Sequence, residues 1–276
     1  QTLTVLLLAC AGGLAARAAG TAQLLCRFQD PEIAESSGLA AASASGEYFF
    51  THNDSGDRAR IFAVDRQGRT LATFKVPGAT NHDWEDMARA RDAEGRPTLL
   101  IGDIGDNGKK RDHVIIYEVP EPPVDVSRAG VHAETEPARR YEVRYPDGPH
   151  DAETLLFNPV SGQVFLVTKD LKSSGVYASR GRLKADEPNV LTKVSWIRFV
   201  SLPATTKSLA DYLRRLLATG GDISPDGTRV VIRTYTDAYE WTIHRGDVAA
   251  AVRTEPTHYP LPVTVQGEAA AYTTDG

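Results

Sequence analysis

Short runs of alternating apolar and polar residues, separated by Gly, Pro, Asp and Asn, fill most of this chain. Alternation with a period of two is typical of β-strands that bury one face, and the separating residues favour turns. The runs form successive sets of four and the start of one more set. They cover residues 38–42, 48–51, 60–64 and 70–76; 87–91, 98–102, 114–119 and 140–145; 154–157, 164–168, 176–178 and 194–200; 222–224, 229–234, 239–243 and 257–262; and 268–272.

One segment has helical periodicity instead. Its apolar residues recur three or four positions apart: Leu209, Tyr212, Leu213, Leu216 and Leu217. Ser208 is a good N-cap residue and Gly220 a good stop. The pattern predicts one short helix near residues 208–218.

An acidic residue precedes or opens each set of runs. These residues are Glu35, Glu85, Glu153, Asp222 and Glu268. Four strands per repeat of this length are typical of a β-propeller, so we expect an all-β propeller of about five four-stranded blades, with six as the alternative. The run at 24–28 would supply the outer strand of the last blade. The final Asp275-Gly276 resembles a turn that is cut off, so we expect this blade to be C-terminally incomplete.

The composition is that of a globular protein, with 276 residues, 41% hydrophobic and 24% charged. The net charge is −5, and Lys and Arg form no run. This balance argues against nucleic acid or an anionic membrane surface as the main partner. We expect a monomer.

The N-terminal segment is apolar over residues 3–14 and then rich in small residues. Ala16-Arg17-Ala18 and Gly20-Thr21-Ala22 both resemble signal-peptidase sites, and the segment is too short to span a bilayer comfortably. We predict an N-terminally clipped signal peptide over 1–22, a single propeller domain over 23–276, and secretion. The alternative is a lipid anchor at Cys10. After cleavage only Cys26 would remain, which excludes an internal disulfide framework.

In a propeller, the loop into each inner strand and the loop between the second and third strands meet at one mouth of the central channel. The stretch His82-Asp83-Trp84-Glu85 recurs as His150-Asp151-Ala152-Glu153. Carboxylates are hard oxygen ligands that suit Ca²⁺ or Mg²⁺, and Ca²⁺ is our prediction. The candidate metal ligands are Glu35, Asp54, Asp83, Glu85, Asp103, Asp106, Asp151, Glu153, Asp222 and Glu268.

Two cations follow the second strands of their blades and are candidate binders of an anion. These are Lys169 and Arg233, which with Glu85 and Glu153 are also the candidate catalytic residues. The candidate substrate-binding residues are His52, Asn53, Asn107, Lys169, Arg233 and Tyr235. The alternative interpretation is structural: Asn-Asp-Ser-Gly and Gly-Asp-Asn-Gly also form ordinary turns, and an acid at the start of a strand often accepts backbone N–H groups.

Four stretches carry a resemblance to a known group: Glu35–Leu39, Thr51–Gly56, Asp83–Met87 and Gly102–Asn107. Together with the repeat layout they resemble secreted bacterial β-propellers, similar in plan to phytase-like and esterase-like propellers. The resemblance implies a calcium-lined acidic channel with nearby Lys and Arg that bind phosphate esters. The chain departs from that plan because it lacks the Asp-x-Asp-Asp-Pro-Ala signature of the phytases, and because the group has one blade more than the count above.

These observations favour an exported, Ca²⁺-binding propeller that hydrolyses a phosphate or other anionic ester. The alternative is a non-catalytic propeller that binds a sugar, wall polymer or protein on the same face. The absence of G-x-S-x-G, P-loop and H-E-x-x-H motifs weighs against the hydrolases and nucleotide-binding proteins that carry them.

Overall fold

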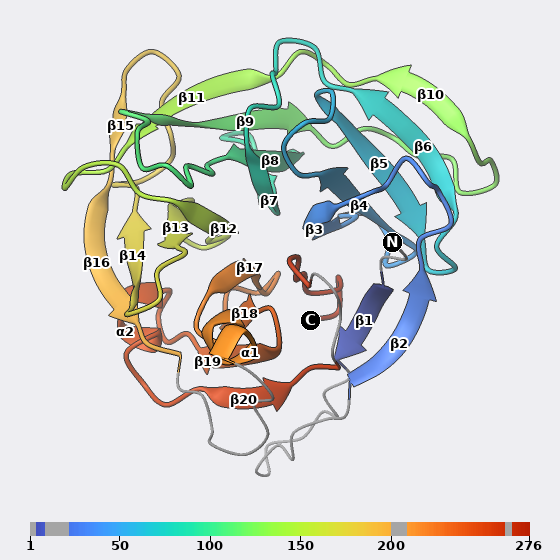
Figure 1. Ribbon diagram of the computed structural model, residues 1–276. Helices are drawn as coiled ribbons and strands as arrows, with labels where there is room; N and C mark the ends of the chain where they lie inside the picture. The colour runs from blue at the N-terminus through green and yellow to red at the C-terminus, as the bar shows by residue number, and fades with distance from the viewer. Residues whose placement is uncertain (1–3, 9–21, 200–208, 263–266) are drawn as a thin grey trace.

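The computed structural model describes residues 4–8, 22–199, 209–262 and 267–276. Within these ranges, four sheets stand around a central axis as the blades of a β-propeller (Figure 1). The predicted all-β propeller is therefore confirmed. The described residues supply four complete blades, where the sequence predicted about five with the last one incomplete.

Each blade has an inner strand at the axis and three further antiparallel strands toward the rim. The first blade contains β3 (Ser36–Ala41), β4 (Tyr48–Asn53), β5 (Arg60–Asp65) and β6 (Thr70–Lys75). The second contains β7 (Trp84–Arg91), β8 (Pro97–Asp103), β9 (Val114–Pro120) and β11 (Arg139–Arg144). The third contains β12 (Ala152–Phe157), β13 (Val164–Thr168), β14 (Ser174–Ala178) and β16 (Thr192–Ile197). The fourth contains β17 (Ala218–Ile223), β18 (Arg229–Thr234), β19 (Asp237–Thr242) and β20 (Thr257–Pro260).

Two short strands extend the rim of the first two blades. The strand β10 (Val131–Glu134) pairs in parallel with β6 of the first blade, although the chain reaches it from the second blade. The strand β15 (Asn189–Val190) likewise leaves the third blade to pair in parallel with β11 of the second. Each addition ties one blade to the next.

The remaining sector of the ring holds no complete blade among the described residues. The strands β1 (Thr4–Leu8) and β2 (Ala22–Arg27) form a separate antiparallel pair there (Figure 1). The C-terminal residues 267–276 lie beside β17 without forming a strand, so the strand predicted at 268–272 is wrong. At the other end of the chain, residues 4–8 of the predicted signal peptide form β1. Cys10 and the predicted cleavage site at 16–18 lie outside the described residues.

The helix prediction was too long. The helix α1 covers Leu209–Arg214 and a turn follows it, while the predicted cap Ser208 lies outside the described residues. Gly220 lies inside β17 and does not end a helix. A second helix, α2 (Val248–Ala251), was not predicted.

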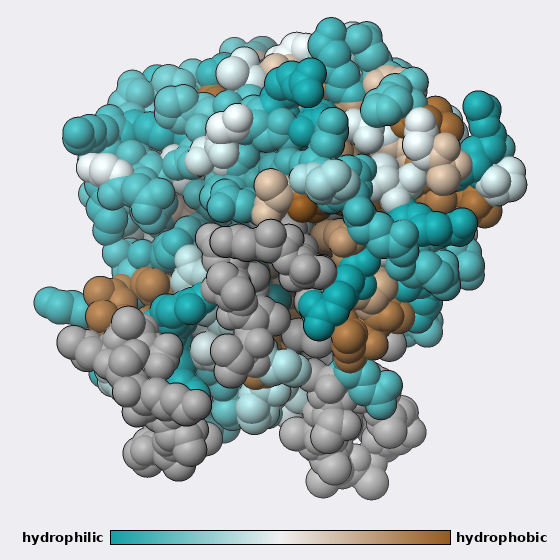
Figure 2. All heavy atoms as spheres, turned by 45° about the vertical axis from the view of Figure 1, so that its right-hand side comes forward, coloured by the Kyte–Doolittle hydropathy of each residue, from teal (hydrophilic) through white to brown (hydrophobic). Residues whose placement is uncertain are grey.

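The hydrophobic core lies between adjacent blades. One cluster joins the first and second blades around Phe50 and Trp84, and another joins the second and third around Tyr177. A further cluster joins the third and fourth blades around Trp241. The inner strands β12 and β17 are buried along their whole length because they are covered on both faces. On the outer face shown in Figure 2, hydrophilic residues predominate and apolar residues form separate patches.

Candidate functional site

A β-bulge begins each inner strand at the same mouth of the channel. The extra residue in each bulge is Ser37, Glu85, Glu153 or Thr219. A bulge turns its extra side chain away from the regular alternation and often marks a functional position. The second and third blades thus present an acid here, and the first and fourth a hydroxyl. From the sequence we had placed Glu35 and Asp222 at positions equivalent to Glu85 and Glu153. This was wrong: the equivalent residues are Ser37, two residues after Glu35, and Thr219, three residues before Asp222.

Three carboxylates meet at this mouth. Oxygen atoms of Asp54, Asp83 and Glu85 all lie within 4.8 Å of one another. Asp54 follows β4, Asp83 precedes β7, and Glu85 is the bulge residue, so two blades contribute. The backbone fixes two of these segments, because Asp54 N donates to Glu35 O at 3.0 Å and Gly105 N donates to Asp83 O at 3.2 Å. Glu85 is only 4% exposed.

Gly105 makes room for these carboxylates. A Cβ atom built on Gly105 would lie 2.3 Å from Glu85 Oε1 and 2.4 Å from Asp83 Oδ2, closer than real Cβ contacts come. Its backbone dihedrals are not in the left-handed region, so the close approach, and not the turn conformation, requires glycine here. The three oxygen donors and this cradle fit a hard divalent cation such as Ca²⁺.

Burial and mutual repulsion make the cluster a poor place for negative charge alone. Burial raises the pKa of Glu85 well above its ordinary value, and the neighbouring carboxylates of Glu153, Asp54 and Asp83 raise it further. Burial, then Asp54, also raises the pKa of Asp83. Burial and Asp54 raise the pKa of Glu268 to about 7. A bound cation would stabilise the ionised forms of all these groups.

The positive charge of Lys169 is already paired within the protein. Its ammonium group forms an ion pair with Glu153 and lies 5.4 Å from the centroid of the Tyr235 ring. Burial alone would lower the pKa of Lys169, but the Glu153 carboxylate reverses this and holds the pKa above its ordinary value. Arg214 covers Tyr235 at 4.8 Å, so this ring has two cations in contact. By register, Lys169 corresponds to Tyr235 and not to Arg233.

Arg233 has one guanidinium nitrogen without a hydrogen-bond acceptor among the described residues. It is 8% exposed; its Nη1 donates to Ala269 O at 2.9 Å and its Nε to Thr234 O at 3.2 Å. Its Nη2 is buried and has no hydrogen-bond partner among the described residues. Burial lowers the pKa of Arg233 to about 10, and Glu268 opposes the fall, so the group stays charged at neutral pH.

Several predicted metal ligands instead accept backbone N–H groups and so stabilise the loops that carry the site. Asp103 accepts the N–H groups of His82 and Asp83 and pairs with Arg111 at 2.8 Å. Asp106 accepts the N–H groups of residues 110 and 111, and its own N–H donates to Asp151 at 2.8 Å.

The predicted residues of the first blade have similar scaffold roles. Asn53 accepts two N–H groups at residues 34 and 35 and donates to Glu32 O. His52 is fully buried, with its ring 5.4 Å from that of Trp84.

The other predicted residues do not belong to the three-carboxylate cluster. Asp222 is buried inside β17, where it accepts Ile223 N and Tyr272 N at 2.8 Å each. Glu35 and Asn107 are exposed.

Two important residues were not among the predicted ligands. The carboxylate of Asp86 is fully buried and accepts Met87 N at 2.8 Å, Leu155 N at 2.9 Å and Gly221 N at 3.3 Å. It therefore joins the second, third and fourth blades at the axis. Arg111 donates to Gly105 O at 2.8 Å and so supports the cradle. The signal for Asp86 was its place in the acidic stretch 82–86; nothing in the sequence marked Arg111.

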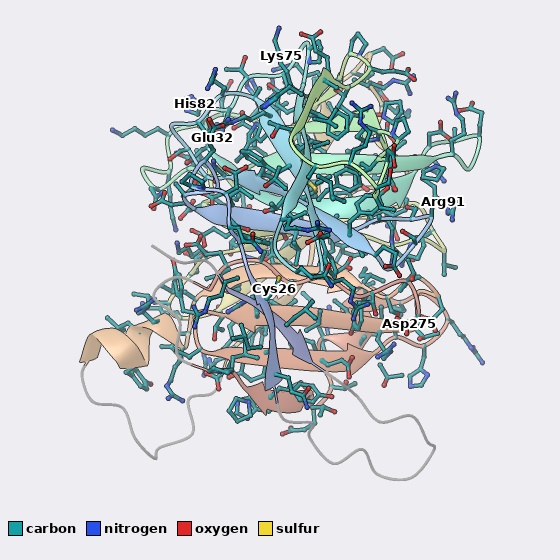
Figure 3. All side chains as sticks on the ribbon, turned by 90° about the vertical axis from the view of Figure 1, so that its right-hand side faces the viewer. Cys26, Glu32, Lys75, His82, Arg91 and Asp275 are labelled. Carbon is teal, nitrogen blue, oxygen red and sulfur yellow. The ribbon has the colours of Figure 1, made fainter. Side chains whose placement is uncertain are left out.

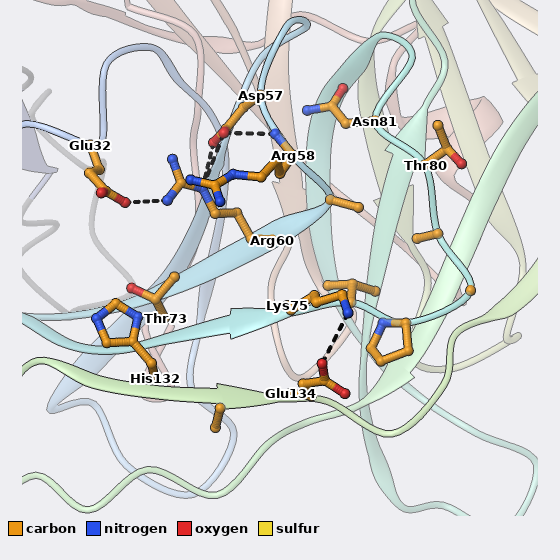
Figure 4. Close-up of a pocket in the computed structure, with 16 residues that line it drawn as sticks. Glu32, Asp57, Arg58, Arg60, Thr73, Lys75, Thr80, Asn81, His132 and Glu134 are labelled. Carbon is orange, nitrogen blue, oxygen red and sulfur yellow. Dashed lines mark hydrogen bonds and ion pairs between the residues drawn. The ribbon is translucent and has the colours of Figure 1, made fainter.

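A separate pocket of about 920 Å³ lies on the flank of the first blade (Figure 4). Its charged residues largely satisfy one another: Arg60 pairs with Asp57 and Glu32, and Lys75 pairs with Glu134 at 3.1 Å. None of the predicted site residues lines it.

Comparison with known proteins gives structural similarity at low sequence identity. No protein-family model matches the chain, and no curated protein sequence matches it. Among solved structures it is similar to the Dos1 propeller, with 12% identity and a TM-score of 0.36 over 88% of this chain and 52% of that chain. It is also similar to a chain of a nidogen/laminin complex (12%, TM-score 0.42, covering 91% and 72%) and to one of Kuenenia stuttgartiensis hydrazine synthase (10%, TM-score 0.41, covering 87% and 78%).

The chain spans about half the length of the Dos1 propeller chain, and likenesses this remote say nothing about activity. The fold assignment rests on the sheets themselves, each running from an inner strand at the axis to the rim (Figure 1). The protein is a β-propeller.

Proposed function

We propose that this propeller binds Ca²⁺ at the mouth formed by Asp54, Asp83 and Glu85, and that the ion and Arg233 together hold an anionic ligand there. The observation that supports the proposal most strongly is the convergence of three carboxylates, with oxygen atoms within 4.8 Å of one another. They lie against Gly105, where any larger side chain would displace two of them. Three anionic oxygens from two loops and a bulge suit Ca²⁺, which accepts irregular oxygen coordination more readily than Mg²⁺ does.

Arg233 supports the anionic part of the proposal. Its buried Nη2 has no hydrogen-bond partner among the described residues, and a guanidinium N–H is a good donor to a carboxylate or phosphate oxygen. Lys169 has less to offer, because Glu153 already balances its charge. We therefore assign ligand binding to Arg233 first and a positioning role to the Glu153–Lys169 pair.

Hydrolysis of an anionic ester is the second candidate function. It is favoured by the Glu153–Lys169 pair, because Glu153 is the bulge residue of the third blade, next to that of Glu85, and the pair can hold a proton close to a bound ligand. Bound Ca²⁺ would supply positive charge that stabilises a developing oxyanion. If the protein does not hydrolyse its ligand, the same mouth would be the binding site of a non-catalytic propeller.

Calcium binding is tested by isothermal titration calorimetry on metal-stripped protein. We expect Gly105→Ala to weaken Ca²⁺ binding at least tenfold, because the added Cβ displaces two carboxylates. Gly108→Ala is the matched control, since its Cβ would meet only Lys110 side-chain atoms at 3.5 Å or more. Equal affinity in the two variants, or no binding by the unmodified protein, would contradict the proposal.

Catalysis is tested separately, by screening phosphate esters and lactones with Ca²⁺ and with a chelator present. Turnover that disappears with the chelator and in Glu153→Gln supports the hydrolase. Calcium binding without turnover of any substrate supports the platform. Neither outcome alters the binding proposal itself.

Export is also part of the proposal. It rests on the apolar segment at 3–14 and the small residues that follow it. No helix in the described ranges is both long and apolar enough to cross a membrane. Expression in a bacterial host, followed by N-terminal sequencing of the protein recovered from the medium, would show whether cleavage falls after Ala18 or Ala22.

A further inference from the structure

The channel has a second mouth, at the opposite ends of the inner strands. In Figure 3, Arg91 and Asp275 lie at the end of the molecule opposite to His82 and Glu32. A pocket of about 180 Å³ lies at this second mouth. The inner strands of all four blades, or the residues just after them, contribute to its lining, together with the C-terminal segment. The lining residues include residue 43 after β3, Arg89 and Arg91 on β7, Phe157 at the end of β12, Ile223 at the end of β17, and Thr274.

The charge of this pocket is opposite to that of the first mouth. Arg89 and Arg91 line it, and no carboxylate does. The nearby Asp222 interacts with Arg89 through its charge but does not line the pocket, and its two oxygens accept Ile223 N and Tyr272 N. The pocket therefore carries positive charge that its lining residues leave unbalanced.

Arg89 is the residue that points to a ligand. Its Nη2 is buried and has no hydrogen-bond partner among the described residues, although the side chain as a whole is partly exposed. A buried guanidinium N–H without an acceptor is unfavourable by about 1–3 kcal/mol or more, since it has lost water and gained nothing. Arg91 differs, because it is exposed and donates to Gly95 O at 2.9 Å.

We propose that the second mouth binds a small oxyanion, held by the guanidinium of Arg89 with Arg91 at the rim. A carboxylate or tetrahedral oxyanion matches the planar donors of arginine, and a pocket of about 180 Å³ admits a group of that size. This site is distinct from the calcium mouth, because the whole length of β7 separates Glu85 from Arg91.

The experiment is a calorimetric and thermal-shift titration in EDTA with phosphate, sulfate, acetate and chloride, each at constant ionic strength. We expect at least one oxyanion to bind and raise Tm while chloride does not. Arg89→Gln should weaken that binding by about tenfold or more, as loss of a charge-assisted hydrogen bond implies. Arg58→Gln, an exposed arginine at the other end of the molecule, should leave it unchanged.

A second variant keeps the test decisive if Arg89→Gln fails to fold. Thr274 is exposed and lines the pocket, so Thr274→Trp should block it without removing Arg89. Oxyanion binding that persists in Thr274→Trp, or that requires Ca²⁺, would place the site elsewhere and overturn the proposal. Absence of any oxyanion effect on the unmodified protein would leave Arg89 only as a distant counter-charge to Asp222 and would also overturn it. Preference among phosphate, sulfate and acetate then identifies the kind of oxyanion.

Discussion

Replacing Asp86 by Ala should destabilise the whole propeller, although Asp86 touches no proposed ligand. Its buried carboxylate accepts three backbone N–H groups, those of Met87, Leu155 and Gly221, from three different blades. Leaving each donor unsatisfied costs about 1–3 kcal/mol. Removing a buried charge offsets part of that loss, because burial raises the pKa of Asp86 well above its ordinary value. We expect the free energy of unfolding to fall by about 3 kcal/mol.

Urea denaturation followed by tryptophan fluorescence measures this change, provided the m-value stays the same. Asp86→Asn should lose less than Asp86→Ala, because one amide oxygen remains to accept across the axis. Asp92→Ala is the matched control: Asp92 also accepts two N–H groups, but within its own turn at residues 94 and 96. A loss no greater in Asp86→Ala than in Asp92→Ala would refute the idea that one carboxylate joins three blades.

Three further changes test other parts of the fold. Burial raises the pKa of Asp222 to about 7, so the folded state binds this proton more tightly than the unfolded state does. Asp222 should therefore lower the stability by about 4 kcal/mol as the pH rises from about 4 to 7, and Asp222→Asn should remove this part of the pH dependence. Tyr272→Phe should loosen the C-terminal segment, because its hydroxyl donates to the buried Glu240 at 2.7 Å, and limited proteolysis should then cut near the C-terminus first. Trp84→Ala should lower the free energy of unfolding by about 3–5 kcal/mol, since its side chain is fully buried and its indole N–H donates to Thr80 O at 3.0 Å.

Each of these has a result that would count against it. A pH profile of unfolding that is the same with and without Asp222 would remove this residue as its cause. Unchanged proteolysis of Tyr272→Phe would show that Tyr272 N–H, bonded to Asp222, holds the segment without the hydroxyl. A loss below about 1 kcal/mol in Trp84→Ala would mean that the core collapses around the missing ring.

The strands were predictable where the local pattern and the tertiary environment agree. The runs at 48–51, 60–64 and 114–119 became β4, β5 and β9 within one or two residues. The strand β10 was missed because most of its residues are exposed, so it has no apolar alternation. The start of β17 was missed because Gly220 indicated the end of a helix, whereas Gly220 and Gly221 both lie in this strand. They are glycines for a different reason: a Cβ on Gly220 would lie 2.1 Å from Glu268 O, and one on Gly221 2.5 Å from Val231 O.

The candidate site was predictable in its residue types but not in its register. The acidic stretch at 82–86 indicated the right mouth, and Asp83 and Glu85 do lie together with Asp54. A bulge shifts register without any local mark in sequence, so Glu35 was aligned where Ser37 stands. The division between ligands and loop acceptors was also hidden, because Asp103 and Asp83 have the same chemistry and differ only in the N–H groups around them.

The parallel strand β10 has a consequence for how the molecule opens. The chain leaves the second blade after β9, adds β10 to the rim of the first blade, and returns as β11 (Figure 1). The first blade therefore cannot peel from the second without also breaking the β10–β6 ladder, so the two should exchange their amide hydrogens as one cooperative unit. The third and fourth blades end in β16 and β20, whose outer edges carry no further strand among the described residues, so exchange should begin there.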